Sequence, residues 1–352
     1  MEIADLLILT KEKGASDLHL TVGVPPMIRL QGDLKKVDAP VLTKDRVHQM
    51  IYDILNDEQR KKFEEDRDLD FSVDLEGVAR FRVNTYFQRR GQGAAFRLIP
   101  HIISSIEELD LPPVIAHLAR KEKGLIIVTG PTGSGKSTTL AAMLNVINKE
   151  RYGHILTIED PIEFVHEHGT CIVNQREVKV HTKSFASALR AALREDPDII
   201  LVGEMRDLET ISLAITAAET GHLVLATLHT MSAPKTVDRI INVFPSDQQE
   251  QIRVQISESI QGVVSQTLIP TFDGKGRVPA VEIMVAVPAV RNLIREAKAY
   301  QITTIIQSGR EYGMQSMDQS LKDLVMKGKI SKREALKRVS SDKIFGETQS
   351  IK

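Results

Sequence analysis

The chain has 352 residues, of which 42% are hydrophobic, so it is long enough to build more than one core and two domains are expected. The 46 basic and 47 acidic side chains nearly cancel and tryptophan is absent, which argues against nucleic acid as a partner. A single cysteine, Cys171, excludes an internal disulfide and a multi-cysteine zinc site. Acidic residues at the start and the lack of any apolar run of membrane-spanning length predict a cytoplasmic protein with no transmembrane segment.

The first 97 residues alternate short apolar runs with turns and predict a small α+β domain. The strand candidates in this domain are 17–22, 27–30, 78–83 and 94–98. Residues 98–113 contain three prolines, Pro100, Pro112 and Pro113, and predict a linker that leads into the next domain.

The pattern of apolar residues changes after the predicted linker, where continuous apolar runs appear at 125–128, 154–158, 199–202 and 223–227. Such runs are typical of strands buried on both faces of a parallel sheet, and helical patterns lie between them. Residues 114–352 are therefore expected to form a doubly wound α/β domain. From about residue 289 the apolar residues recur at helical spacing, which predicts a helical C-terminal region.

The segment that follows the first of these runs matches the pattern G-x-x-x-x-G-K-[ST], with Thr138 next: Gly130, Pro131, Thr132, Gly133, Ser134, Gly135, Lys136 and Ser137. Backbone N–H groups in such a loop, together with the start of a helix, bind phosphate oxygens. Lys136 is expected to reach the β- and γ-phosphates and Ser137 to ligate Mg²⁺. The position between a strand and a helix argues against an incidental glycine-rich turn, so we expect an ATPase that binds ATP and Mg²⁺.

Acidic residues follow two of the strand candidates, at the edge of the sheet where ligands bind in open α/β folds. Glu163 is suited to take a proton from the attacking water or to orient it, and Glu159 or Asp160 to act on Mg²⁺ or its waters. A solvated acidic turn is the alternative for this segment.

Glu204 ends a strand that resembles a Walker B strand, with Glu in place of Asp. It either holds Mg²⁺ through water or orients the nucleophile.

Histidines and arginines supply the remaining site candidates. His229 stands at the carboxyl end of the last apolar run and is predicted to sense the γ-phosphate, whereas His222 at the opposite end is a weaker candidate. Arg80, Arg82 and Arg97 lie in strands of the N-terminal domain and fit a solvated face. In an oligomeric ATPase, arginines from a neighbouring domain or subunit also stabilise charge on the transferred phosphate.

The phosphate loop, the segment 158–163, the Glu204 strand and the segment 220–229, in this order, resemble the Walker A, Asp box, Walker B and His box of the secretion and type IV pilus ATPases. Residues 14–20 and 77–84 extend the resemblance to that family's N-terminal domain. The resemblance implies a PAS-like N-terminal domain and a RecA-like P-loop C-terminal domain. It also implies a homohexamer docked at the inner face of the bacterial inner membrane, on the pilus platform protein.

The same resemblance implies roles for individual residues. Glu163 and Glu204 correspond to the family's catalytic carboxylates. Arg82 and Arg97 correspond to its interdomain arginines, and Asp33 to a residue that approaches the nucleotide.

The segment Arg291, Asn292, Leu293, Ile294, Arg295 and Glu296 resembles a C-terminal signature of the family's retraction branch. The single cysteine argues against the zinc element of the extension and secretion branches. The implied function is an ATP-hydrolysing motor that removes pilin subunits, retracts type IV pili and drives twitching motility, with a retraction paralogue as a further partner. A pilus-assembly or type II secretion ATPase is the main alternative. A nucleic-acid motor and a non-catalytic nucleotide switch are less favoured.

Spacing alone gives the C-terminal signature a second interpretation of equal weight. Leu293 and Ile294 fit the packed face of a C-terminal helix, with Arg291 and Arg295 facing water.

Overall fold

The computed structural model describes residues 1–30, 32–75, 77–99, 103–274, 276–339 and 345. The chain divides into two compact units, Met1–Ile102 and Ile103–Lys352. The predicted linker and the predicted C-terminal domain each include positions outside the described residues, namely 100–102 for the linker and 275, 340–344 and 346–352 for the domain. Among the described residues, no helix has both the length and the apolar character of a membrane span.

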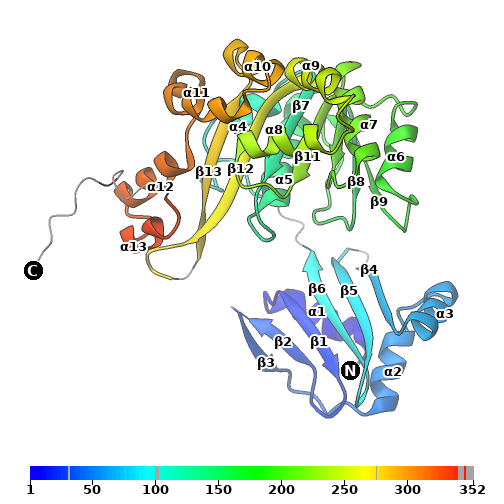
Figure 1. The fold of residues 1–352 in the computed structure, drawn as a ribbon. Coiled ribbons are helices and arrows are strands. Elements are labelled where there is room, and N and C mark those ends of the chain that lie inside the picture. Colours follow the sequence, from blue (N-terminus) through cyan, green and yellow to red (C-terminus); the bar gives the residue numbers. More distant parts are fainter. Residues whose placement is uncertain (31, 76, 100–102, 275, 340–344, 346–352) are drawn as a thin grey trace, which may run out of the picture. The chain divides into compact units, whose positions relative to one another are not determined.

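The first unit is an α+β unit, as predicted, built on an antiparallel sheet with the strand order β3-β2-β1-β6-β5-β4 (Figure 1). Its core contains the fully buried side chains of Leu6, Phe63, Phe81 and Phe96. Its elements are α1 (Ile3–Glu12), β1 (Asp17–Thr21), β2 (Met27–Leu30), β3 (Asp33–Lys36), α2 (Lys44–Tyr52), α3 (Asp57–Asp66), β4 (Asp68–Leu75), β5 (Ala79–Gln88) and β6 (Gly91–Ile99).

The second unit is a doubly wound α/β unit whose sheet has the order β13-β12-β7-β11-β10-β8-β9. Its elements are α4 (Val114–Ala119), β7 (Gly124–Thr129), α5 (Lys136–Glu150), β8 (Gly153–Glu159), β9 (Cys171–Glu177), α6 (Phe185–Ala192), β10 (Ile199–Val202), α7 (Leu208–Glu219), β11 (Leu223–Leu228), α8 (Ala233–Asn242), α9 (Gln249–Ser259), β12 (Ile260–Pro270), β13 (Arg277–Val285), α10 (Pro288–Arg295), α11 (Ile302–Ser308), α12 (Met317–Met326) and α13 (Lys332–Leu336), with 3-10 turns at Ala299–Gln301 and Arg310–Tyr312.

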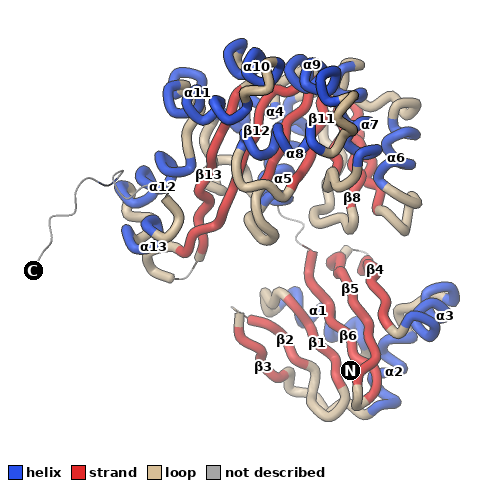
Figure 2. Tube along the Cα trace, in the orientation of Figure 1, coloured by secondary structure: helices blue, strands red, loops and turns tan. Residues whose placement is uncertain are grey.

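Helices cover both faces of the second unit's sheet (Figure 2). Residues of α4 and α5 pack on one face, and residues of α6 to α11 pack on the other. The central strands β7, β10 and β11 are buried along their whole length, which explains their continuous apolar sequences. The sheet is parallel except at β13, which runs antiparallel to β12 because a short hairpin leaves no room for a crossover.

The register of the parallel strands brings four strand ends to one edge of the sheet. Thr129, the last residue of β7, pairs with Leu228 at the end of β11. Val202 at the end of β10 is level with Ala226 in β11 and with Ile158 in β8. The segments that follow β7, β8, β10 and β11 therefore leave the sheet at the same edge.

Candidate active site

The phosphate loop connects β7 to α5 and turns on three glycines with positive φ. Gly130, Gly133 and Gly135 have φ values of 141°, 76° and 87°. A Cβ on Gly130 would lie 2.1 Å from the carbonyl oxygen of Gln266, so this position requires glycine. Gly135 directly precedes α5, so the free N–H groups of the helix's first turn open onto the loop.

Lys136 folds back over this loop. Its Nζ donates hydrogen bonds to the carbonyl oxygens of Gly130, at 3.0 Å, and Pro131, at 3.1 Å. Burial lowers the pKa of Lys136, and the nearby charges of Glu204 and Glu163 oppose this shift. The ammonium group thus lies within the electrostatic reach of both predicted catalytic carboxylates.

Glu204 lies just beyond β10 and is contacted by two basic side chains. Its Oε1 accepts from Arg206 Nε at 2.7 Å and from His229 Nε2 at 3.1 Å. Burial alone would raise the pKa of Glu204, but the hydrogen bond from Arg206 and the charges of Arg206 and His229 hold it below its usual value. The structure therefore brings Glu204 and His229 into contact. It adds Arg206, which the sequence analysis missed although it stands two residues after Glu204.

The acidic segment after β8 divides into one buried and two more exposed residues. Glu159 is buried and accepts from Thr157 Oγ1 at 2.6 Å and from Gln175 Nε2 at 3.2 Å. Asp160 pairs with Lys179 Nζ at 3.4 Å, and Glu163 is exposed to solvent. Only Glu163 of the three combines exposure with a charge that acts on Lys136.

A small cavity of about 30 Å³ joins Glu159 to the phosphate loop, because Ser137 lines it together with His166, Gly203 and Thr227. This volume is about that of a single water molecule. Burial lowers the pKa of His166 to about 4, so this side chain is neutral at physiological pH. His166 carries no local motif, and the sequence analysis did not identify it.

Glu159 is expected to make stability depend on pH. Burial raises its pKa from an ordinary value of 4.5 to about 7. The folded protein therefore holds a proton that the unfolded chain releases, so the free energy of unfolding falls as pH rises from 4.5 to 7. The change is on the order of 3 kcal/mol. Urea unfolding at pH 5 and pH 8 should show this decrease in the wild type and a smaller one in Glu159→Gln.

The neighbouring variant Asp160→Asn is the control for this measurement, since Asp160 is exposed and paired with Lys179. It should keep the wild-type dependence on pH. An equal decrease in Glu159→Gln would show that the buried proton is held elsewhere.

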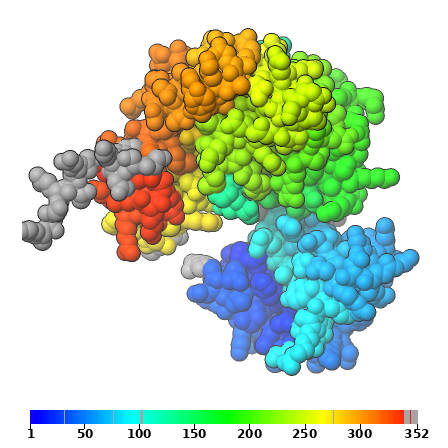
Figure 3. All heavy atoms as spheres, in the orientation of Figure 1, coloured from blue at the N-terminus to red at the C-terminus, as the bar shows by residue number. Residues whose placement is uncertain are grey.

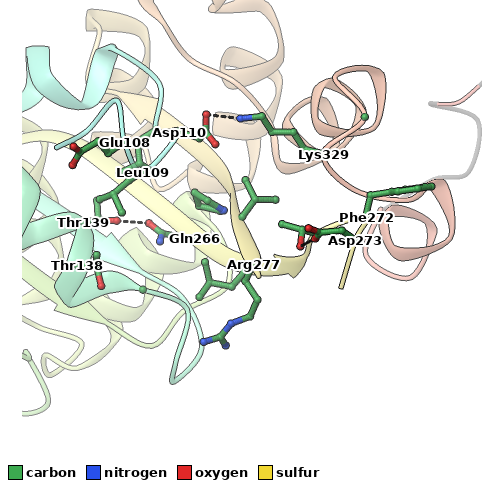
Figure 4. A pocket seen from close by; sticks show the side chains of 17 residues that line it. Glu108, Leu109, Asp110, Thr138, Thr139, Gln266, Phe272, Asp273, Arg277 and Lys329 are labelled. Atoms are coloured by element: carbon green, nitrogen blue, oxygen red, sulfur yellow. Dashed lines mark hydrogen bonds and ion pairs between the residues drawn. The ribbon is translucent and has the colours of Figure 1, made fainter. Parts of the chain in front are cut away.

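A larger cavity of about 670 Å³ opens beside the start of α5 (Figure 4). Gly135, Thr138 and Thr139 line it on the side of the phosphate loop. The rest of the wall comes from the segment before α4, from β12 and β13 with their hairpin, and from the turn after α12, and it includes Leu109, Leu268, Phe272, Arg277, Val278 and Lys329. The volume is in the range of cavities that bind small molecules.

The remaining candidates lie away from this edge or in the first unit. His222 stands at the other end of β11, where its Nδ1 is 2.9 Å from the carbonyl oxygen of Ala217, so the structure does not bring it to the phosphate loop.

Arg82 and Arg97 are cross-strand partners on β5 and β6 of the first unit, and Arg97 Nε donates to Asp17 Oδ1 at 2.9 Å. Arg80 and Arg82 share one face of β5, whose other face carries buried side chains. Asp33 is exposed at the start of β3. What these first-unit residues do for a nucleotide stays a prediction.

Comparison with known proteins agrees with this arrangement. Residues 10–338 match the family model described as type II/IV secretion system protein. The chain belongs to this family. It is 57% identical over 345 residues to the "type IV pilus retractation ATPase PilT" of Pseudomonas aeruginosa strain PAO1, covering 98% of this chain and 100% of that protein. It is 54% identical over 316 residues to a "twitching motility protein" of Neisseria gonorrhoeae, covering 90% and 84%.

A solved structure from the same family has nearly the same fold. The crystal structure of the pilus retraction motor PilT with bound ADP superposes with a TM-score of 0.91 at 47% sequence identity. The match covers 97% of this chain and 98% of the other. The family, the fold class and the resemblance to a PilT-like retraction ATPase are therefore confirmed.

The C-terminal signature of this family member lies on α10 and the turn after it. Val290 and Ile294 are buried in the core, and Leu293 packs partly against it. Asn292, Arg295 and Glu296 are exposed. The space-filling view shows α10 and α11, in orange, at the surface of the second unit (Figure 3).

The interpretation in which both arginines of the signature face water is wrong for Arg291. This side chain donates to the carbonyl oxygens of Ser257, at 2.6 Å, Glu258, at 2.8 Å, and Ala286, at 3.0 Å. Two of these carbonyls belong to the last turn of α9, where helix carbonyls lack intrahelical partners. Arg291 therefore caps the C-terminal end of α9. A cation at this position donates hydrogen bonds to the free carbonyls and interacts favourably with the helix dipole.

Arg291→Ala is expected to lower the free energy of unfolding by about 2 kcal/mol, since hydrogen bonds from a charged donor would be lost. Arg295→Ala, in the same helix but exposed, should change it by less than about 0.5 kcal/mol. Thermal unfolding followed by circular dichroism compares the two variants. Equal shifts in Tm would contradict the assignment of Arg291 to the end of α9.

Proposed function

We propose that this protein is an ATP-hydrolysing motor that powers retraction of type IV pili. The observation that carries the proposal is the gathering of Lys136, Glu204 and His229 beside a phosphate loop, in a chain 57% identical over its length to a pilus retraction ATPase. The phosphate loop and the carboxylates support hydrolysis. The full-length similarity to a retraction ATPase supports this role over pilus assembly or secretion.

The cavity beside α5 is suited to the nucleoside part of ATP, since it begins at Gly135 and Thr138, immediately after the phosphate loop. The triphosphate would then lie along Gly130 to Ser137. Lys136 would exchange its two carbonyl acceptors for β- and γ-phosphate oxygens. The buried Ser134 Oγ has no hydrogen-bond partner among the described residues. A buried polar atom of this kind is consistent with a loop that binds an anion.

In the proposed reaction a water oxygen attacks the γ-phosphorus, and the bond from that phosphorus to the β,γ-bridging oxygen breaks. The products are ADP and inorganic phosphate. Glu163 takes the proton of the attacking water, because it is exposed and lies near Lys136. Arg206 holds Glu204 in place, and Glu204 in turn positions the side chains at this edge of the site. His229 contacts Glu204 and senses the γ-phosphate.

Mg²⁺ would supply charge neutralisation between the β- and γ-phosphates. Ser137 would ligate it, and Glu159 and Glu204 would act through its waters, with Asp160 the less favoured residue because of its ion pair with Lys179. Among the described residues there is no group of three or more His, Cys, Asp or Glu side chains suited to a metal. Mg²⁺ does not require such a group, because proteins often bind it through one or two side chains together with phosphates and water.

At the level of the assembly we propose a homohexamer on the cytoplasmic side of the inner membrane. Its partner there is the pilus platform protein, and a retraction paralogue shares the task. The exposed Asn292, Arg295 and Glu296 belong to a signature whose role we place in retraction rather than in hydrolysis. Differences in affinity for ATP and ADP between conformations would convert hydrolysis into movement of the platform.

The test is to delete the gene in its host and restore either the wild type or Glu204→Ala, then to count surface pili and measure twitching. We expect abundant pili and no twitching in the deletion strain, with rescue by the wild type alone. Bald cells would indicate an assembly motor. Unchanged pili and motility would indicate another secretion system.

A further inference from the structure

Strand β12 extends past the end of β7 and lies against the phosphate loop. Ser265 pairs with Thr129, the last residue of β7, so the next residue, Gln266, stands beside Gly130 at the start of the loop. The Gln266 carbonyl oxygen occupies the space that a Cβ on Gly130 would need. With 3% of its surface exposed, Gln266 is a buried polar residue against the loop.

The side-chain amide of Gln266 connects two parts of the site. Its Nε2 donates to the carbonyl oxygen of Ser134 in the loop at 2.8 Å. Its Oε1 accepts from Thr139 Oγ1 in the first turns of α5 at 2.7 Å (Figure 4). The orientation of the amide is fixed, because a carbonyl oxygen only accepts hydrogen bonds and so the amide nitrogen must face Ser134.

These contacts determine how one peptide group of the loop is turned. In a trans peptide the carbonyl oxygen and the following N–H point in opposite directions. Holding the Ser134 carbonyl toward Gln266 therefore turns the Gly135 N–H away from β12. Gly135 has a positive φ and tolerates many backbone conformations, so its own residue type does not fix this orientation.

We propose that Gln266 is a positioning residue that holds the phosphate loop in its nucleotide-binding conformation. The inference rests on the proposed ATP site but assigns a residue outside its sequence motifs. Gln266 pre-sets the direction of the Gly135 N–H and ties the loop to the first turns of α5. Without it, a nucleotide has to order this peptide on binding, which weakens affinity for the phosphates.

The experiment measures binding of fluorescent MANT-ADP to full-length protein carrying Gln266→Met, which keeps the length of the side chain but removes both hydrogen bonds. We expect affinity about tenfold weaker than in the wild type. Gln261→Met is the matched control, since Gln261 lies at the other end of the same strand, and its affinity should equal that of the wild type. The Tm of the nucleotide-free proteins is measured in parallel.

A role in positioning predicts that ADP raises the Tm of Gln266→Met less than that of the wild type at the same ADP concentration. Affinity within twofold of the wild type would overturn the proposal. Should Gln266→Met not fold, Thr139→Val removes one of the two hydrogen bonds, and affinity weaker by about threefold would support the proposal while unchanged affinity would overturn it. Failure of the wild type itself to bind MANT-ADP would instead contradict the proposed function.

Discussion

Lys136→Ala is expected to reduce ATP turnover by a factor of about 10³, the cost of removing a preorganised positive group from a phosphate site. In the structure its ammonium lies on the loop carbonyls of Gly130 and Pro131, near the charges of Glu204 and Glu163. Lys136 is the only lysine among the eight residues of the phosphate loop. The measurement is steady-state release of inorganic phosphate over a range of ATP concentrations.

Lys149→Ala provides the control, since Lys149 is an exposed lysine near the other end of α5. Its turnover should match that of the wild type. Turnover by Lys136→Ala within tenfold of the wild type would mean that another group neutralises the phosphates, and the assignment of this loop would have to be revised.

Glu204→Gln is expected to lower kcat by a factor of about 10²–10³ while leaving the affinity for ADP within a few-fold of the wild type. The amide keeps the shape of the side chain but removes the negative charge that Arg206 and His229 contact. Loss in kcat without loss of binding would place the role of Glu204 after nucleotide binding. Phosphate release and MANT-ADP titration measure the two quantities separately.

Glu219→Gln serves as its control because Glu219 is an acid at the far end of α7, bonded to Gln255 rather than to the site. It should hydrolyse ATP at the wild-type rate. A parallel loss of binding and turnover in Glu204→Gln would instead indicate that the charge supports the structure of this edge.

The sequence was sufficient to predict those parts of the site that are marked by a contiguous motif or by the end of a strand. A phosphate loop is a contiguous motif, and Glu204 and His229 lie within two residues of the ends of strands whose buried positions are continuous apolar runs. Parallel pairing then requires these ends to meet. The contact of Gln266 with the loop could not be predicted in this way, because it joins Ser134 to a residue 132 positions later, and no local pattern marks it.

Strands outside the centre of the sheet were harder to predict. β9 alternates buried and exposed positions, as expected for a strand at the edge of the sheet. β12 buries Ser265 and Gln266, so polar residues interrupt its apolar run. The role of Arg291 also depends on tertiary structure, since the end of α9 that it closes is more than thirty positions earlier in the chain.

The order of strands in the second unit also has a consequence for local opening. β7, β11 and β10 lie between β13 and β12 on one side and β8 and β9 on the other, and they are buried on both faces. We therefore expect their amide hydrogens to exchange with deuterated water only when the whole unit opens, and those of β9 and β13 to exchange by fraying at the edges. Since the phosphate loop leaves the sheet from one of the slowest-exchanging strands, its anchor stays folded while the outer strands fluctuate.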